Sequence, residues 1–284
     1  MNLFVLLVIA LLISFSILVI SRMSDKSSNK NNNSDNSAHT PAILSVHSAE
    51  LSSSSSSSSA LQSSLSVVEQ SMDIETHLGI MKCKIYGPID GTGIPIITVH
   101  GMNIVLVNEW SYISRYLSTR GYRVYMLNFH SNDDLKPSSL HSIDFNRIIT
   151  DIIAKYITSV DKMDVILMGK SWGGQSVATY SSIKEHAKFI RKVVLIAPGI
   201  PKGKKDIVFA LGKVQIPVFL GWAKDDMIMS NIVVDVWMKA FDEDNMNEKQ
   251  QQQLWLHTYN VESGGHLIFN EYAEPIEQFL LLDH

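Results

Sequence analysis

The sequence predicts an α/β fold, a doubly wound and mostly parallel sheet that helices cover on both faces. Two observations carry this prediction. Short runs that are almost entirely apolar recur along the chain, and amphipathic stretches of helical length separate them. Strands that are apolar on both faces are typical of parallel sheets, because helices cover both sides of such a sheet. The regular alternation of the two kinds of segment is typical of successive β-α units.

The elements are expected in order from residue 67, the start of the predicted folded domain, 67–284. An opening strand pair is expected over 66–77 and 79–85, and apolar runs predict strands at 94–101, 122–129, 163–171, 192–199, 216–223 and 254–261. Helical patterns lie near 109–119, 143–159, 172–188, 231–241 and 270–282. Only 16 residues separate Gly199 from Ile216, which is too few for a large cap domain.

Two segments of different character precede this domain. Residues 3–20, LFVLLVIALLISFSILVI, form an uncharged run that as a helix would be about 27 Å long, close to the thickness of a bilayer core. No A-x-A-like cleavage site follows, so we expect a retained, single-pass membrane anchor over 1–22 rather than a cleaved signal peptide. Residues 23–66 are rich in Ser and Asn and have few large apolar side chains, which predicts a disordered tether.

Charge and cysteine content bear on location and partners. Arg22, Lys26 and Lys30 follow the apolar run, and by the positive-inside rule they place the folded domain in the cytosol. The single cysteine, Cys83, agrees with a reducing compartment and excludes an intramolecular disulfide. A glycosylation sequon at 32–34 keeps a lumenal or secreted location open. The net charge of −4, with no basic stripe, argues against a nucleic-acid partner.

A serine motif stands between a predicted strand and a predicted helix. The residues are Gly169-Lys170-Ser171-Trp172-Gly173, and G-x-S-x-G in this context is the pattern of a nucleophile elbow. In that turn a strained backbone exposes the serine, and Gly169 and Gly173 allow the close approach it needs. Ser171 is the predicted nucleophile, and the backbone N–H of Trp172 is a predicted donor to an oxyanion.

A second strand end supplies the other predicted oxyanion donor. The run IPIITVHG closes with His100-Gly101-Met102. We expect the backbone N–H of Met102 to be this donor, because the glycine permits a bend there. His100 itself is expected to be a structural hydrogen-bonding residue.

A serine nucleophile also needs a histidine base and a carboxylate that orients it. His266 follows the last predicted strand in the loop ESGGHLIF and is the histidine best placed for that role. After the strand 216–223, WAKDD supplies Asp225 and Asp226. Alignment on the common W-G-x-x-D pattern favours Asp226, with Asp225 solvated beside it. Asp206, in the charged run KGKKD, is a weaker alternative.

In this chain order, Ser171, Asp226 and His266 resemble the catalytic residues of the α/β-hydrolase superfamily, and the resemblance covers about 67–284. It implies a serine hydrolase that cleaves an ester, thioester or amide through an acyl-enzyme, without a cofactor or metal. GKSWGG also resembles the D-W-G-G elbow of epoxide hydrolases and haloalkane dehalogenases, with serine in place of aspartate. The layout resembles small membrane-anchored members of the alpha/beta hydrolase domain 14 type.

The expected partners are a small-molecule or acyl substrate and, through the N-terminal helix, a membrane. A second hypothesis is a catalytically silent hydrolase fold that serves as a membrane-tethered binding module. The long tether suggests it, as does the loop NFHSNDDLKPSS at 128–139, which departs from the D-x-x-G-x-G-x-S pattern common in the superfamily.

Overall fold

The computed structural model describes residues 67–88, 91–157, 165–200, 205–229, 231–242, 256–267 and 270–282. All of them belong to one compact unit, Leu61–His284. The predicted anchor at 1–22 and the predicted tether at 23–66 lie outside the described residues. Within the described part, none of the helices combines the length and the apolar character needed to cross a bilayer.

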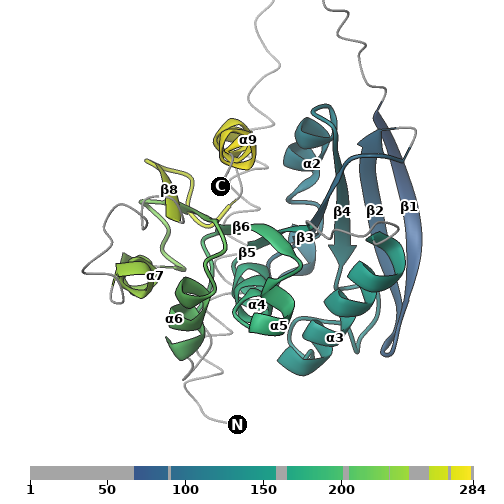
Figure 1. Cartoon of the computed structure of the whole chain (residues 1–284), viewed down its shortest axis with the longest axis horizontal. Helices are drawn as coiled ribbons and strands as arrows, with labels where there is room; N and C mark the ends of the chain where they lie inside the picture. The colour runs from purple at the N-terminus through teal and green to yellow at the C-terminus, as the bar shows by residue number, and fades with distance from the viewer. Residues whose placement is uncertain are drawn as a thin grey trace, which may run out of the picture. The chain divides into compact units, whose positions relative to one another are not determined.

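The described strands form one eight-stranded sheet in the order β1-β2-β4-β3-β5-β6-β7-β8. In chain order these are β1 (Val67–Thr76), β2 (Gly79–Pro88), β3 (Ile94–Val99), β4 (Tyr122–Asn128), β5 (Val165–Lys170), β6 (Ile190–Ile196), β7 (Val218–Ala223) and β8 (Leu256–Val261). The pairs β1–β2 and β2–β4 are antiparallel, and every pair from β4 to β8 is parallel. Figure 1 shows the sheet running from β1 at one edge to β8 at the other. The predicted fold class is confirmed.

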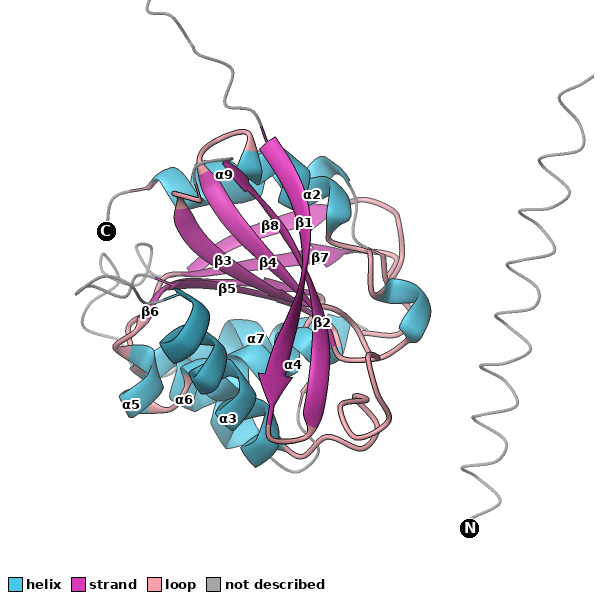
Figure 2. Cartoon of the chain, turned by 90° about the vertical axis from the view of Figure 1, so that its right-hand side faces the viewer, coloured by secondary structure: helices cyan, strands magenta, loops and turns pink. Residues whose placement is uncertain are grey.

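Helices cover both faces of this sheet. Figure 2 shows α2 (Ser111–Ser118) and α9 (Ala273–Leu281) on one side. The other side carries α3 (Ser142–Ile152), α4 (Trp172–Ser181), α5 (Lys184–Ala187), α6 (Lys205–Lys213) and α7 (Asn231–Asp242). Three short helical turns complete the described helices: η1 (Ile104–Leu106), η2 (Ile153–Ile157) and η3 (Asn270–Tyr272).

Two apolar clusters lie between the sheet and these helices, one on each face. In β5, Leu167 belongs to the cluster under α3, α4, α6 and α7, whereas Ile166 and Met168 belong to the cluster under α2 and α9. Successive side chains of a strand point to opposite faces, so a strand with both faces covered must be apolar throughout. This burial explains the continuous apolar runs in the sequence.

The structure corrects two details of the prediction. The helix expected over 172–188 is divided into α4 and α5, because the chain turns at Ser182 and Ile183. The connection between Gly199 and Ile216 contains α6, which the sequence reading did not identify. This helix packs against α4 and α7 within the helical layer, with Val208 and Leu211 buried. It is no cap over the sheet edge, and the described residues contain no large cap domain, as expected.

The parallel part of the sheet determines where functional residues meet. The strands β3, β5, β7 and β8 run in the same direction, so their carboxyl ends lie along one edge. In open α/β sheets, ligands bind just beyond these ends. Apart from Gly169, which lies in β5, each site residue predicted from the sequence follows one of these four strands.

Candidate active site

The turn that holds Ser171 has the strained geometry expected of a nucleophile elbow. Ser171 has φ 52° and ψ −116°, in a region that a residue with a side chain rarely adopts. Such a backbone costs on the order of 1–3 kcal/mol and persists only where its surroundings hold it in place. Its N–H donates to Ile196 O at 3.0 Å, and its carbonyl accepts from the N–H groups of Gln175 and Gly199. These bonds to β6 and α4 fix the serine between the strand and the helix.

Both predicted glycines of the elbow are required by close packing. A Cβ on Gly173 would lie 2.4 Å from Val99 O and 2.6 Å from His100 O, at the end of β3. A Cβ on Gly169 would lie 2.5 Å from Gly173 O. The first turn of α4 therefore rests directly on the backbone of β3 and β5, and only glycine fits at these two positions.

Asp226 and His266 meet at the same edge of the sheet. Asp226 Oδ2 lies 2.7 Å from His266 Nδ1, and Asp226 Oδ1 accepts the N–H groups of Ile228 and Met229 at 2.8 and 2.9 Å. Burial by itself would raise the pKa of Asp226, but the bonds from His266 and these two N–H groups outweigh it, and the pKa is lowered. Asp226 is therefore a buried carboxylate that presents one oxygen to the imidazole.

Asp225, expected to be merely solvated, has a contact of its own. Its carboxylate is exposed, yet Oδ1 accepts the N–H groups of Gly264 and Gly265 at 2.8 and 2.7 Å. These bonds lower the pKa of Asp225. Since Gly265 immediately precedes His266, Asp225 holds the turn from which the imidazole projects. The two adjacent acids therefore bond to different partners, Asp226 to the imidazole and Asp225 to the backbone. The alternative acid, Asp206, lies on α6.

His100 is a buried hydrogen-bonding residue, as expected. Its Nε2 accepts the Phe129 N–H at 3.0 Å, so the ring proton lies on Nδ1, which donates to Gly101 O at 2.6 Å. Burial lowers the pKa of His100 to about 4. The Gly101 carbonyl and the Met102 N–H belong to one peptide group and point in opposite directions when it is trans. The bond from His100 therefore fixes the direction of the Met102 N–H.

The two predicted oxyanion donors both lie beside Ser171. Trp172 follows it as the first residue of α4, and a Cβ on Gly101 would lie 3.7 Å from Ser171 Cβ. Neither the Met102 N–H nor the Trp172 N–H donates a hydrogen bond to another described residue. His130 Nε2 contacts Met102 O at 3.0 Å and holds the far side of that residue. One backbone donor after β3 and one after β5 are therefore without a partner among the described residues.

Among the described residues, no hydrogen bond joins Ser171 Oγ to His266. The imidazole has its Nδ1 occupied by Asp226, which leaves Nε2 for the nucleophile. Catalytic hydrogen bonds of this kind are often long without substrate and tighten only when it binds. The structure places the three residues at one sheet edge and joins two of them directly.

A buried ion pair beside the elbow was missed in the sequence. Lys170 Nζ lies 2.8 Å from Glu109 Oε2, and the two side chains are 0% and 6% exposed. Glu109 Oε1 accepts the Gly101 N–H at 2.6 Å. A lysine that ends an otherwise apolar strand was the available signal, because a buried charge must be paired. The sequence offered no way to choose its partner.

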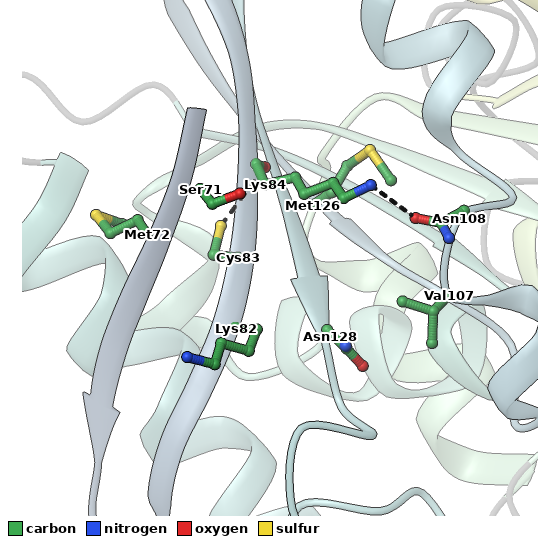
Figure 3. Close-up of a pocket in the computed structure, with 9 residues that line it drawn as sticks. All are labelled: Ser71, Met72, Lys82, Cys83, Lys84, Val107, Asn108, Met126 and Asn128. Atoms are coloured by element: carbon green, nitrogen blue, oxygen red, sulfur yellow. Dashed lines mark hydrogen bonds between the residues drawn. The ribbon is translucent and has the colours of Figure 1, made fainter. Parts of the chain in front are cut away.

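Two cavities of the described part are lined by neither Ser171, Asp226 nor His266. One of about 310 Å³ opens between β1, β2, β4 and the loop before α2, and Figure 3 shows Lys84 reaching across it to Asn108. Neither Ser171 nor His266 lines it. A smaller space of about 80 Å³ lies between α3 and α4 and is lined in part by Trp172. Cys83, beside the first cavity, has its pKa raised to about 12 by burial, so its thiol is unreactive.

Comparison with known proteins agrees with this geometry. Residues 95–222 match the family described as serine aminopeptidase, S33. Three solved structures are similar to the chain at low sequence identity. A putative dienelactone hydrolase from Klebsiella pneumoniae is 15% identical, with a TM-score of 0.58 over 76% of this chain and 97% of that one. Naproxen esterase from Bacillus subtilis is 12% identical, with a TM-score of 0.56 over 75% and 92% of the two chains. A serine hydrolase without a lid from Xanthomonas campestris is 15% identical, with a TM-score of 0.53 over 75% and 93%.

The fold and the comparisons define the class of protein. The chain has the α/β-hydrolase fold, and the described residues include no large cap domain. The match to a hydrolase family over residues 95–222 supports a hydrolytic function.

Proposed function

We propose that the chain is a serine hydrolase that cleaves an ester, thioester or amide through an acyl-enzyme. The observation that carries this proposal is the positive φ of Ser171 in a glycine-lined turn, at the same sheet edge as the bonded pair of Asp226 and His266. At φ 52°, Ser171 has a strained backbone conformation for a residue other than glycine. Residues in such conformations cluster at functional sites.

The reaction follows from the contacts. His266 Nε2 takes the proton of Ser171 Oγ as that oxygen attacks the acyl carbonyl, while Asp226 keeps its bond to Nδ1 and stabilises the imidazolium. The N–H groups of Met102 and Trp172 donate to the oxyanion of the tetrahedral intermediate. The intermediate collapses as the leaving group takes the proton from His266. Water then attacks the acyl-enzyme with His266 as base, which restores Ser171 and releases the acid.

Apolar side chains near these residues suit an acyl substrate. Met102 and Leu267 are each 55% exposed and Met227 is 91% exposed, and each is a predicted site residue or the immediate neighbour of one. Large exposed apolar side chains gathered near a site favour an apolar ligand over a strongly charged one. The proposed substrate is a small molecule or an acyl group carried on one.

The proposal includes a membrane partner and a location. Residues 3–20 are an uncharged run long enough to span a bilayer core, with basic residues on its C-terminal side. We propose that residues 1–22 anchor the chain as a single pass, with residues 23–66 as a tether and the hydrolase domain in the cytosol.

A covalent probe tests the reaction. A fluorophosphonate reagent applied to the full-length chain in detergent micelles is expected to label the wild type and not the Ser171→Ala variant. A folded wild type that resists the probe would overturn the proposal and favour the silent binding module. Turnover of a p-nitrophenyl ester that is lost in His266→Ala would exclude that module.

A further inference from the structure

Glu109 lies where two strand ends of the site meet. Its Oε2 bonds to Lys170, the last residue of β5 and the direct neighbour of Ser171. Its Oε1 accepts the N–H of Gly101, the direct neighbour of Met102. A single carboxylate therefore connects the strand that carries the nucleophile to the strand end that carries a predicted oxyanion donor.

The position of Glu109 is itself fixed by its neighbour in the sequence. Trp110 is buried, and its Nε1 donates to Val99 O at 3.1 Å, at the end of β3. This contact sets the start of α2 against β3, so the Glu109 carboxylate cannot drift from Gly101. A Cβ built on Gly101 would lie 3.6 Å from Glu109 Oε1 and 3.7 Å from Ser171 Cβ, which places all three in one small volume.

Stability alone does not account for a pair of this kind. Removing two charges from water costs several kcal/mol per ion, and well-packed apolar residues of similar volume are often as stable as a buried ion pair. The side chains of Lys170 and Glu109 are almost fully buried, in a region where the rest of β5 is apolar. The contacts of Glu109 give the pair a geometric role instead, because each of its oxygens bonds to a different side of the site.

We propose that Glu109 and Lys170 are positioning residues that hold the Gly101–Met102 peptide in register with Ser171, so that the Met102 N–H faces the developing oxyanion. The proposal rests on the function proposed above. Within this arrangement, His100 binds the Gly101 carbonyl, which belongs to the peptide that carries the donor. Glu109 binds the Gly101 N–H, which belongs to the preceding peptide, so the two bonds restrain the peptide groups on both sides of Gly101 Cα. Lys170 ties the carboxylate to the nucleophile strand.

Two double variants isolate the bond to Gly101. Glu109→Gln with Lys170→Met keeps an acceptor for the Gly101 N–H, and Glu109→Met with Lys170→Met removes it. Both are uncharged and nearly equal in volume. We expect kcat for a p-nitrophenyl ester to be at least about tenfold lower in the variant without the acceptor, with KM within about twofold, because a small misplacement of catalytic groups lowers the rate strongly.

A third variant covers the case in which the double variants do not fold. Glu109→Asp keeps the charge but shortens the side chain by about 1.5 Å, one carbon–carbon bond. The shorter carboxylate cannot bond to Lys170 and to the Gly101 N–H at the same time. A positioning role predicts a kcat about tenfold below wild type at unchanged KM. A role limited to neutralising Lys170 predicts wild-type kcat.

The outcomes separate this inference from the proposed function. Equal kcat in the two double variants, or wild-type kcat in a folded Glu109→Asp, would overturn the positioning role while the wild type still reacts with the fluorophosphonate probe. A wild type that neither reacts nor turns over ester would overturn the proposed function, and the positioning role with it. Thermal unfolding of each variant shows which of them are folded.

Discussion

Asp225 and Asp226 are neighbours in the chain, but their carboxylates have different partners. Asp226 is buried and bonds to the His266 imidazole, whereas Asp225 is exposed and bonds to the backbone of Gly264 and Gly265. One acid orients the ring and the other holds the turn that carries it. At the residue scale, the site depends on which bond each side chain makes more than on which residue types are present.

This difference predicts unequal effects of two matched substitutions. Asp226→Asn should lower kcat by about 10⁴-fold, because the amide neither holds the neutral imidazole in the correct tautomer nor stabilises the imidazolium. Asp225→Asn should lower kcat less than about threefold, since the amide oxygen still accepts the two glycine N–H groups. Steady-state kinetics on a p-nitrophenyl ester measures both. Equal losses in the two variants would contradict the assignment.

The buried His100 side chain should make the free energy of unfolding depend on pH. Burial lowers its pKa from 6.5 to about 4, so the unfolded chain binds the proton more readily than the folded chain. The contribution of His100 to stability is therefore full above pH 6.5 and is lost as the pH falls from 6.5 to 4, by up to about 3 kcal/mol. Denaturant unfolding at several pH values measures it. His100→Gln should have a shallower pH dependence over this range, and an unchanged slope would refute the prediction.

At the scale of elements, the elbow depends on contact between the first turn of α4 and the end of β3. Gly173 brings these two backbones together, and no other residue leaves room for the carbonyls of Val99 and His100. The helix therefore acts as part of the site, because it fixes the height of Ser171 above the sheet and presents the Trp172 N–H. The ion pair between Lys170 of β5 and Glu109, just before α2, joins the nucleophile strand to the segment that leads into α2.

Gly173→Ala tests this contact. The added methyl group meets two backbone oxygens, so α4 must shift, and we expect a loss of about 1–3 kcal/mol in the free energy of unfolding together with slower labelling of Ser171. Ser176→Ala, on the same helix and only partly buried, should change stability by less than about 0.5 kcal/mol. Denaturant unfolding and probe kinetics compare the two variants. A Gly173→Ala variant as stable and reactive as Ser176→Ala would show that the close approach is unnecessary.

For the whole molecule, the site is assembled from strand ends that are widely spaced along the chain. The strands β3, β5, β7 and β8 lead to the proposed oxyanion donor, nucleophile, acid and base, and their parallel arrangement brings these residues to one edge. No described helical insertion covers this edge.

The proposed anchor yields a prediction for the whole chain. Deletion of residues 1–22 should move the protein from the membrane fraction to the soluble fraction, because the apolar run supplies the bilayer contact. Probe labelling of Ser171 should be unchanged, since the deleted residues precede the hydrolase domain. In sealed microsomes carrying the full-length chain, added protease should digest the domain if it faces the cytosol. A deletion variant that stays with the membranes would count against the anchor.

Local patterns account for most of what the sequence predicted. The alternation of apolar runs and amphipathic stretches identified the sheet, and the glycines around Ser171 identified the elbow, because both depend on neighbours within a few residues. The helix α6 was missed because its segment is short and the residues described as buried in it, Val208 and Leu211, give a weak pattern. The division between α4 and α5 depends on a turn that the same apolar pattern does not reveal.

By itself the sequence determined the fold class, the lack of a large cap domain and the positions of Ser171, Asp226 and His266 at strand ends. Only the tertiary structure decided which acid meets the imidazole, what Asp225 holds, and that Glu109 pairs with Lys170. Glu109 and Lys170 are 61 residues apart and meet because β3 pairs with β5. Contacts of this kind follow from the order of strands in the sheet, which a pattern along one chain does not contain.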